Sequence, residues 1–241
     1  MSDRPNVREL LARLNPKNCR FDIGQGGMPT LTDTDIAGAL GMVPNGLGRD
    51  ILIYLHWPEG ARIDRKSILR AMAEATRAEM DRRDELVRIA RLAYHIEREN
   101  WAERAHHNEQ HRRDMDRARG EHETAKLIAW PHDPEMHARL RHSVLDEMSA
   151  PNHCRECAGR GERVVRMGVR ASCPTCGGRG VIPVSDRQRA DRLGRDESTY
   201  RRAWRSMYDW TWNLLSLEEG RAAEAFAAAL GFGRSAAHVP E

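Results

Sequence analysis

The chain has few aromatic residues, few cysteines and no long apolar run. Aromatic side chains make up 5% of its 241 residues, and the mean hydropathy is −0.71. No stretch approaches the ~18 consecutive apolar residues that a membrane-spanning helix needs. Residues 1–20 are polar and lack the apolar centre of a secretory signal peptide. We therefore expect a cytoplasmic protein without a membrane partner, built as one large domain or as two to three small ones.

A strong charge of one sign is also absent, because the net charge is only +3. This balance does not by itself indicate a nucleic-acid partner. Arginine is nevertheless concentrated near the C-terminus: segment 154–182 has six arginines against two acids, and segment 185–213 has seven against five. Arginine can pair through two hydrogen bonds with phosphate and with guanine edges. The distribution of charge thus favours nucleic acid more than the total does.

Four of the five cysteines form a C-x2-C, fifteen residues, C-x2-C pattern: Cys154, Cys157, Cys173 and Cys176. This spacing is typical of a zinc site made of two paired knuckles. A cytosolic compartment disfavours disulfides, and a redox C-x-x-C would not need a second matched pair. Four thiolates complete tetrahedral coordination and leave no open position, so we expect one structural Zn²⁺. Cys19 is expected to be an ordinary thiol.

Both cysteine pairs continue as C-x-x-C-x-G-x-G, at Gly159 and Gly161 and at Gly178 and Gly180. Glycine tolerates positive φ angles, which let backbone N–H groups turn toward a sulfur. The segment 163–170 has room for two short strands. We therefore expect residues 151–183 to form a small zinc finger with a short β-hairpin, stabilised by about 10 kcal/mol or more through the metal.

The N-terminal half is predicted to be helical. Residues 1–30 are read as a flexible arm and residues 31–150 as a helical body. Two short helices separated by a turn at 44–46 are expected, followed by a third that Asp64 caps and that ends near Met80.

A fourth apolar stripe covers residues 86–101, after which the apolar face fades. Segment 102–123 is rich in arginine, acids and histidine. We expect one long charged helix with ion pairs three and four residues apart, or disorder at its far end. A further helix is expected to begin at Pro134, and the hinge to the zinc finger lies near Pro151.

After the zinc finger, segment 184–232 has the pattern of a helix-turn-helix with a terminal helix, and 233–241 is a tail. Ser185 and Gln188 form a capping box, and Gly194 occupies the turn. Asp196 can cap the second helix. A packed helical hairpin with a solvated face is the alternative. The fold class is thus mainly α: a helical body, a four-cysteine zinc finger and a C-terminal helix-turn-helix.

The second of these helices carries polar and basic residues where a recognition helix would contact DNA. Arginines in its first turns are spaced to follow a groove or its phosphates, and its N-terminus can accept a phosphate. Ser and Thr at the front can hydrogen-bond base edges. The predicted DNA-binding residues are Arg195, Ser198, Thr199, Arg201, Arg202 and Arg205.

No catalytic constellation is present. We find no serine–histidine–aspartate set and no paired carboxylates suited to acid–base chemistry. His107 and His111 lie four residues apart, but Asn108 occupies the position where an HExxH site needs glutamate. A solvated charged helix is the better interpretation of that segment. We therefore expect a non-enzymatic protein.

Three segments carry a resemblance to a known family: residues 34–42 (TDIAGALGM), the two C-x2-C-x-G-x-G knuckles, and residues 198–209 (STYRRAWRSMYD). In this order they resemble the late-gene antitermination proteins of lambda-type bacteriophages, the lambda Q family. Segment 81–125 departs from that pattern, because it is longer and more charged.

This resemblance implies a factor that acts in the host bacterial cytoplasm. Such a factor binds double-stranded DNA within the late promoter and loads onto RNA polymerase paused near it. It contacts the sigma factor and the polymerase flap beside the RNA exit channel, and then suppresses pausing and termination. The alternatives are a zinc-containing repressor or activator that acts at initiation and, less favoured, a J-protein-like zinc chaperone module, whose repeat is also C-x2-C-x-G-x-G.

Overall fold

The computed structural model describes residues 31–57, 63–164 and 169–231, together with Val7, Leu10, Leu11 and Leu14. The protein is mainly helical and has one small two-stranded sheet, as expected. Most of the predicted arm (1–30), including Cys19, and the predicted tail (233–241) lie outside the described residues. Within the described ranges, no helix combines the length and apolar character that crossing a bilayer requires.

The elements follow one another with short connections. The N-terminal part contains α2 (Asp33–Met42), α3 (Leu47–His56), α4 (Arg65–Glu103), α5 (Glu109–Ile128) and α6 (Pro134–Ser149). The strands β1 (Glu162–Val164) and β2 (Arg170–Ser172) come next. The C-terminal part contains α7 (Asp186–Leu193), α8 (Glu197–Thr199), a π-helical turn η3 (Tyr200–Trp204) and α9 (Arg205–Ala229), of which the last three form one continuous helical segment.

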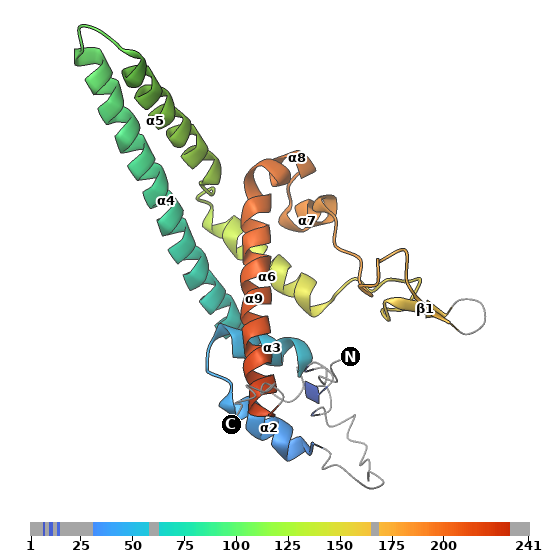
Figure 1. The fold of residues 1–241 in the computed structure, drawn as a ribbon. Coiled ribbons are helices and arrows are strands. Elements are labelled where there is room, and N and C mark those ends of the chain that lie inside the picture. Colours follow the sequence, from blue (N-terminus) through green and yellow to red (C-terminus); the bar gives the residue numbers. More distant parts are fainter. Residues whose placement is uncertain are drawn as a thin grey trace, which may run out of the picture.

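Helix α9 runs through the centre of the molecule, with α2 and α3 around its C-terminal half and α6 across its N-terminal half (Figure 1). One apolar cluster joins α3, α4, α6 and α9 through Ile51, Met72, Leu140 and Tyr208, all fully buried. Segments 31–150 and 184–232, which the sequence suggested as separate parts, therefore share one hydrophobic core. The terminal helix is a central part of the helical body.

A second apolar cluster lies at the C-terminal end of α9. Phe226 packs there with Ile36 of α2 and Leu52 of α3, and Leu11 from the N-terminal segment is fully buried in the same cluster. Gly48 lets α3 approach α9 closely, since a Cβ at this position would lie 2.5 Å from the Glu218 carbonyl oxygen. Helix α9 thus connects both clusters.

Helix α4 is continuous where the sequence suggested a third helix ending near Met80 and a separate fourth stripe. Residues 81–85 contain neither glycine nor proline, so nothing in the local sequence interrupts the helix. Glu79 also pairs with Arg82 and Arg83 on the following turn, at 2.7 Å in each case. The helix therefore extends without a break from Arg65 to Glu103.

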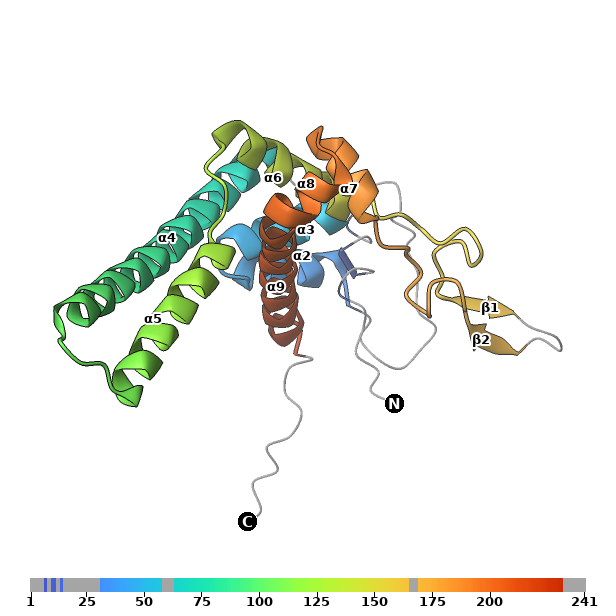
Figure 2. The same ribbon diagram turned by 90° about the horizontal axis from the view of Figure 1, so that it is seen from above.

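The prediction of one long charged helix through residues 102–123 is wrong. The chain reverses at residues 104–108, and α5 returns antiparallel beside α4 to form a hairpin that projects from the body (Figures 1 and 2). Asn108 caps α5 by accepting a hydrogen bond from the His111 backbone N–H (2.9 Å). The Trp101 ring stacks on His107 with centroids 3.7 Å apart. These local contacts favour a turn where charge pattern alone suggested continuity.

The cysteine region extends from the opposite side of the body (Figure 2). Strands β1 and β2 pair antiparallel, with Glu162 opposite Ser172 and Val164 opposite Arg170. His153 and Val181 form an isolated bridge, and the Ile182 N–H donates to the Asn152 carbonyl at 2.8 Å. This pairing closes the base of the module, here defined as residues 152–182 and called the cysteine module.

Candidate metal centre and nucleic-acid interface

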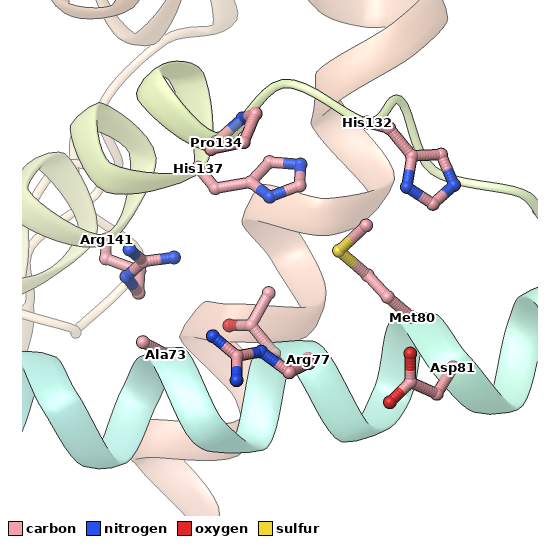
Figure 3. A pocket seen from close by; sticks show the side chains of 9 residues that line it. Ala73, Arg77, Met80, Asp81, His132, Pro134, His137 and Arg141 are labelled. Atoms are coloured by element: carbon pink, nitrogen blue, oxygen red, sulfur yellow. The ribbon is translucent and has the colours of Figure 1, made fainter.

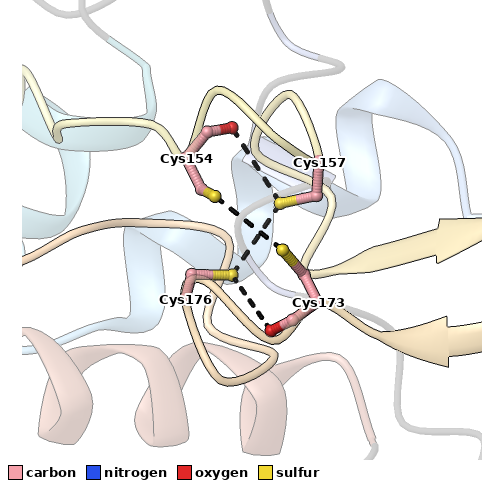
Figure 4. A group of neighbouring side chains, drawn as sticks. All are labelled: Cys154, Cys157, Cys173 and Cys176. Atoms are coloured by element: carbon pink, nitrogen blue, oxygen red, sulfur yellow. Dashed lines mark hydrogen bonds between the residues drawn. The ribbon is translucent and has the colours of Figure 1, made fainter.

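The four predicted ligands come together. Cys154, Cys157, Cys173 and Cys176 are buried, and their Sγ atoms all lie within 4.8 Å of one another (Figure 4). The sulfurs of Cys154 and Cys173 are 3.9 Å apart, and those of Cys157 and Cys176 are 3.8 Å apart. A disulfide would need about 2.05 Å. The cysteines are therefore free thiols in one cluster.

The sulfur spacing fits a tetrahedral metal. With a metal–sulfur distance of about 2.3 Å, the edges of a regular tetrahedron of sulfurs are about 3.8 Å. Both measured pairs agree with this value. Among the described residues, this is the one group of histidine, cysteine or acidic side chains close enough to share an ion. The histidines of segment 102–123 form no such cluster there.

The glycines act as the sequence predicted. The backbone N–H groups of Gly161 and Gly180 point at the sulfurs of Cys157 and Cys176, each at 3.2 Å. Both glycines have φ of +74°. Each knuckle thus directs one backbone donor at the sulfur of its second cysteine.

The two knuckles also interlock, which the sequence did not reveal. The Cys154 N–H donates to the Gly180 carbonyl, and the Cys173 N–H donates to the Gly161 carbonyl, both at 2.8 Å. A Cβ at Gly161 would lie 2.3 Å from the Gly178 carbonyl oxygen. Glycine is thus required here both for the left-handed backbone and for this close approach.

The thiols need a cation to be ionised together. Burial raises the pKa of the Cys154 thiol to about 11. The backbone N–H of Cys176 lowers the pKa of Cys173 to about 7. Four adjacent thiolates would repel one another in the buried cage, and a bound dication removes that repulsion. The donor set and its spacing are therefore compatible with a metal held by all four cysteines.

The arginines of the cysteine module differ in their surroundings. Arg163 pairs with Glu156 at 3.3 Å, and Arg170 lies 3.9 Å from Glu162. Arg179 donates to the Cys176 carbonyl at 3.0 Å, next to the cage. Two more are exposed and form no ion pair among the described residues, Arg155 and Arg160; Arg166 lies outside them.

Helices α7 and α8 are joined through Gly194, whose φ of +66° ends α7 in a left-handed cap. The predicted capping box of Ser185 and Gln188 is confirmed. Asp196 caps α8 as predicted, accepting from the Thr199 N–H at 2.9 Å and from the Ser198 hydroxyl at 2.6 Å. The Ser198 hydroxyl and the Thr199 N–H lower the pKa of Asp196 well below its usual range.

The arginines predicted to bind DNA are exposed, and most already contact carboxylates. Arg201 pairs with Asp186 at 3.1 Å and with Glu197. Arg205 contacts the same Asp186 at 3.4 Å. Arg202 follows Arg201 in the same helical segment and is exposed, but it has no ion pair among the described residues.

Arg195 is positioned differently from these three. It lies after the Gly194 turn and reaches the Asp133 carboxylate of α6 at 3.6 Å. Asp186 and Asp133 were not among the predicted site residues. The sequence provides little indication that Asp186 contacts Arg201, because Asp186 is the first residue of α7 and lies fifteen positions before Arg201. Only the tertiary packing of α7 against the following helix brings these groups together.

A buried polar network holds α7 against the body. Arg189 of α7 makes two hydrogen bonds to Glu147 of α6, at 2.7 and 3.1 Å. The Tyr208 hydroxyl donates to the same carboxylate at 2.7 Å, and burial raises its pKa. The Arg189 guanidinium also lies 4.6 Å from the centre of the Tyr208 ring. The network links α6, α7 and α9, and the sequence pattern did not indicate it.

Comparisons of the chain with protein-family models, with curated proteins and with solved structures found no match.

Proposed function

We propose that the chain is a non-enzymatic phage transcription antitermination factor of the type it resembles. It binds double-stranded DNA in a late promoter, loads onto host RNA polymerase paused near that promoter, and suppresses pausing and termination. The observation that supports it most is the direct succession of the four-cysteine cage and the α7–α8 turn, with exposed arginines on both. This is the order of elements on which the resemblance to the lambda Q family depends.

In this proposal the metal is one structural Zn²⁺. A set of four soft thiolates in a tetrahedron favours zinc over magnesium or calcium, which prefer oxygen. All four positions are taken by protein, so the ion has no site for water or substrate. Its role is to order the cysteine module, whose exposed Arg155 and Arg160 then add phosphate contacts that position the DNA without reading it.

The helices after the module act as a helix-turn-helix. Ala190 and Leu193 of α7 pack with Tyr200 and Trp204 at the start of the long helix, in one apolar cluster. The pair is thereby held together, with Asp196 and Ser198 exposed at the start of α8 and Glu197 and Thr199 half-buried. We propose that α8 and the first turns of α9 form the recognition helix, because a recognition helix contacts base edges through its N-terminal residues.

The arginine pairs determine how this surface binds DNA. Arg202 is ready to contact DNA, whereas Arg201 and Arg205 first have to leave Asp186. A phosphate can replace that carboxylate, because both are anions that accept from a guanidinium. Asp186 therefore weakens non-cognate binding: sequences that cannot supply well-placed anions do not displace it. Truncation of Arg202 to alanine is expected to cost about 1–3 kcal/mol on a cognate site if it reads a base.

The α4–α5 hairpin is proposed to contact the polymerase, including the sigma factor and the flap beside the RNA exit channel. Its α4 helix carries four large apolar side chains that are 39–55% exposed: Leu86, Ile89, Leu92 and Ile96. Their spacing of three and four residues places them along one side of the helix. Exposed contiguous apolar surface of this kind is typical of protein-binding sites.

The deciding experiment is transcription in vitro from the phage's own late promoter through a terminator. With the protein present, we expect more full-length transcript, and only from templates that keep the promoter-proximal DNA. A change in initiation without read-through would favour the repressor or activator alternative, which the same DNA-binding surface would serve. Binding of unfolded polypeptide without binding of DNA would favour the chaperone alternative.

Two variants sharpen the test of the DNA surface. Arg202→Ala is expected to weaken cognate DNA binding by about 1–3 kcal/mol and to lower read-through with it. Asp186→Asn is expected to raise affinity for random duplex DNA several-fold, because it removes the carboxylate that Arg201 and Arg205 share and leaves each with one ionic partner, Glu197 and Asp209 respectively. Arg91→Ala, an exposed arginine of α4 without an ion pair among the described residues, serves as the matched control in the DNA-binding assay, and not for read-through, because it lies on the hairpin proposed to contact the polymerase. Equal behaviour of Arg202→Ala and Arg91→Ala would contradict the proposed interface.

A further inference from the structure

A cavity of about 370 Å³ lies between α4 and α6, away from the residues proposed to bind DNA. Figure 3 shows Arg77 projecting from α4 and Arg141 from α6 toward the space between the two helices. Ala73, Met80 and Pro134 supply apolar wall. The volume falls within the range of about 300–1,000 Å³ that is usual for small-molecule sites.

Two arginines line this cavity, and neither is paired with a described carboxylate. Arg77 and Arg141 form no hydrogen bond or ion pair with another described residue. Asp81 lines the cavity one helical turn beyond Arg77, but no ion pair joins the two side chains in the described structure. His132, at the rim, contacts Asp84 at 3.2 Å instead.

Arg141 is half-buried and has no ion pair among the described residues. Three other half-buried arginines each have a carboxylate: Arg65 with Asp146 at 2.6 Å, Arg83 with Glu79 at 2.7 Å, and Arg189 with Glu147 at 2.7 Å. Two more, Arg49 and Arg104, form no ion pair with a described carboxylate, and Arg49 donates to the Asn45 side chain instead. An enclosed charge is costly unless it is paired. Burial lowers the pKa of Arg141, and the neighbouring charge of Arg77 lowers it further. An anion between the two guanidinium groups would remove both penalties.

His137 adds a neutral polar group to the same cavity. Its Nε2 lies 2.7 Å from the Pro131 carbonyl oxygen, which accepts and so requires the proton on Nε2. Burial lowers the pKa of His137, so the ring is neutral near pH 7 and Nδ1 is left as an acceptor. The cavity therefore offers two cationic forks, one acceptor suited to a hydroxyl group, and apolar wall.

We propose that this cavity binds a phosphate monoester, whose phosphoryl group lies between the guanidinium groups of Arg77 and Arg141. A phosphate dianion balances two arginines, and its oxygens match the geometry of the guanidinium fork. The organic part of the ester would fill the remaining volume beside Met80. The ester can be a free small molecule or the terminal phosphate of a nucleic-acid strand, since both present the same chemistry.

The test uses the full-length metal-bound protein and isothermal titration with phenyl phosphate, at constant ionic strength set with chloride. We expect saturable binding by the natural protein and at least about tenfold weaker binding by Arg77→Ala and by Arg141→Ala, because each removes one charge-assisted pair. Arg91→Ala, the control on an exposed part of α4, is expected to bind as tightly as the natural protein. Thermal unfolding of each variant checks that the fold persists.

A second measurement separates the two sources of the ester. Short single strands with a 5′-phosphate or a 5′-hydroxyl are compared in competition with phenyl phosphate. Competition only by the phosphorylated strand assigns a nucleic-acid end, and no competition by either assigns a free small molecule. The proposal is overturned if phenyl phosphate does not bind, or if both arginine variants bind it as tightly as Arg91→Ala. DNA binding through α8 and α9 involves other residues and is unaffected by that result.

Discussion

The cysteine module and the α4–α5 hairpin both project from the helical body, but different interactions hold them together (Figures 1 and 2). The buried cluster of the module consists of the four cysteines, with Ile182 packed beside them. Its two strands are short, and the residues of β1 are exposed. A metal held by the four cysteines would therefore supply most of the stability of the module.

The described residues of the hairpin form neither a cluster of possible metal ligands nor a large apolar core. Of its α5 residues, Ala118 and Ala125 are buried, and these are small side chains. Between the two helices lie the Tyr94–His122 ring stack at 5.3 Å and the hydrogen bond from Arg83 to the Ile128 carbonyl at 2.8 Å, whereas the ion pairs of α5 lie within that helix. Each contact is weak, so the stability of the hairpin depends on many small contributions. The comparison predicts that single substitutions have large effects in the module and small effects in the hairpin.

The largest effect is expected from loss of a metal ligand. Cys173→Ser should remove the bound ion and unfold residues 152–182, because a structural zinc contributes about 10 kcal/mol or more. The helical body should remain folded, since its two apolar clusters contain no cysteine. Metal analysis together with amide NMR spectra measures both. Cys19→Ser is the control, and loss of metal there would contradict the proposed ligand set.

The next largest effect is expected in the helical core. Phe226→Ala removes a fully buried ring from the cluster between α2, α3 and α9 and should cost about 3–5 kcal/mol. Leu92→Ala in the hairpin should change the free energy of unfolding by less than about 0.5 kcal/mol, because Leu92 is 55% exposed. Urea unfolding measures both. Similar losses for the two variants would show that the hairpin has an apolar core after all.

Within the module, a smaller effect distinguishes two glycines. Gly161→Ala should cost about 2–4 kcal/mol through left-handed strain and contact with the Gly178 carbonyl. Gly177→Ala, with φ of +59° and open space around it, should show the strain alone. Competition with a chromophoric chelator measures the resulting loss of metal affinity. Equal losses would contradict the interlocked geometry of the knuckles.

The smallest effect is expected at the base of the hairpin, where Glu79 holds Arg83, whose guanidinium donates to the Ile128 carbonyl at 2.8 Å. The hydrogen bond from Arg82 lowers the pKa of Glu79. The contribution of Glu79 to stability is therefore complete above its pKa in the unfolded chain, about 4.3. It is lost as the pH falls through the lower pKa of Glu79 in the folded protein. Protection factors for hydrogen exchange of α5 amides, which correct for the intrinsic pH dependence of the exchange rate, should fall below about pH 4.

Glu79→Gln should make that exchange faster at neutral pH by a factor equivalent to at most about 1 kcal/mol, and should remove the acid dependence. Glu74→Gln, at an exposed position of α4 without an ion pair among the described residues, is the control. An unchanged acid response in Glu79→Gln would assign the effect to another carboxylate.

Prediction from the sequence succeeded where the relevant groups are close along the chain. The two cysteine pairs, the positive-φ glycines and the caps at Ser185 and Asp196 all follow from spacings of two to four residues. Such motifs act through local geometry and need no knowledge of the rest of the fold. The hairpin turn was missed because the charges of segment 102–123 suit a helix equally well in one piece or two.

The candidate DNA surface shows the same division. Arg201, Arg202 and Arg205 were recognised from their position on a helix, but their ionic partners were not. Asp186 reaches two of them only because α7 folds back onto the following helix. Likewise, Arg77 and Arg141 are 64 positions apart and line one cavity only because α4 and α6 pack together.

The sequence by itself determined the two cysteine knuckles, the helical character and the helix caps at Asp64, Ser185 and Asp196, because each depends on groups within one turn or one knuckle. Tertiary structure decided that α9 is the centre of the body, that α5 returns along α4, and which arginines are neutralised by acids. These outcomes depend on packing between helices far apart in the chain, where many pairings satisfy the same local pattern and burial of a shared apolar surface selects one.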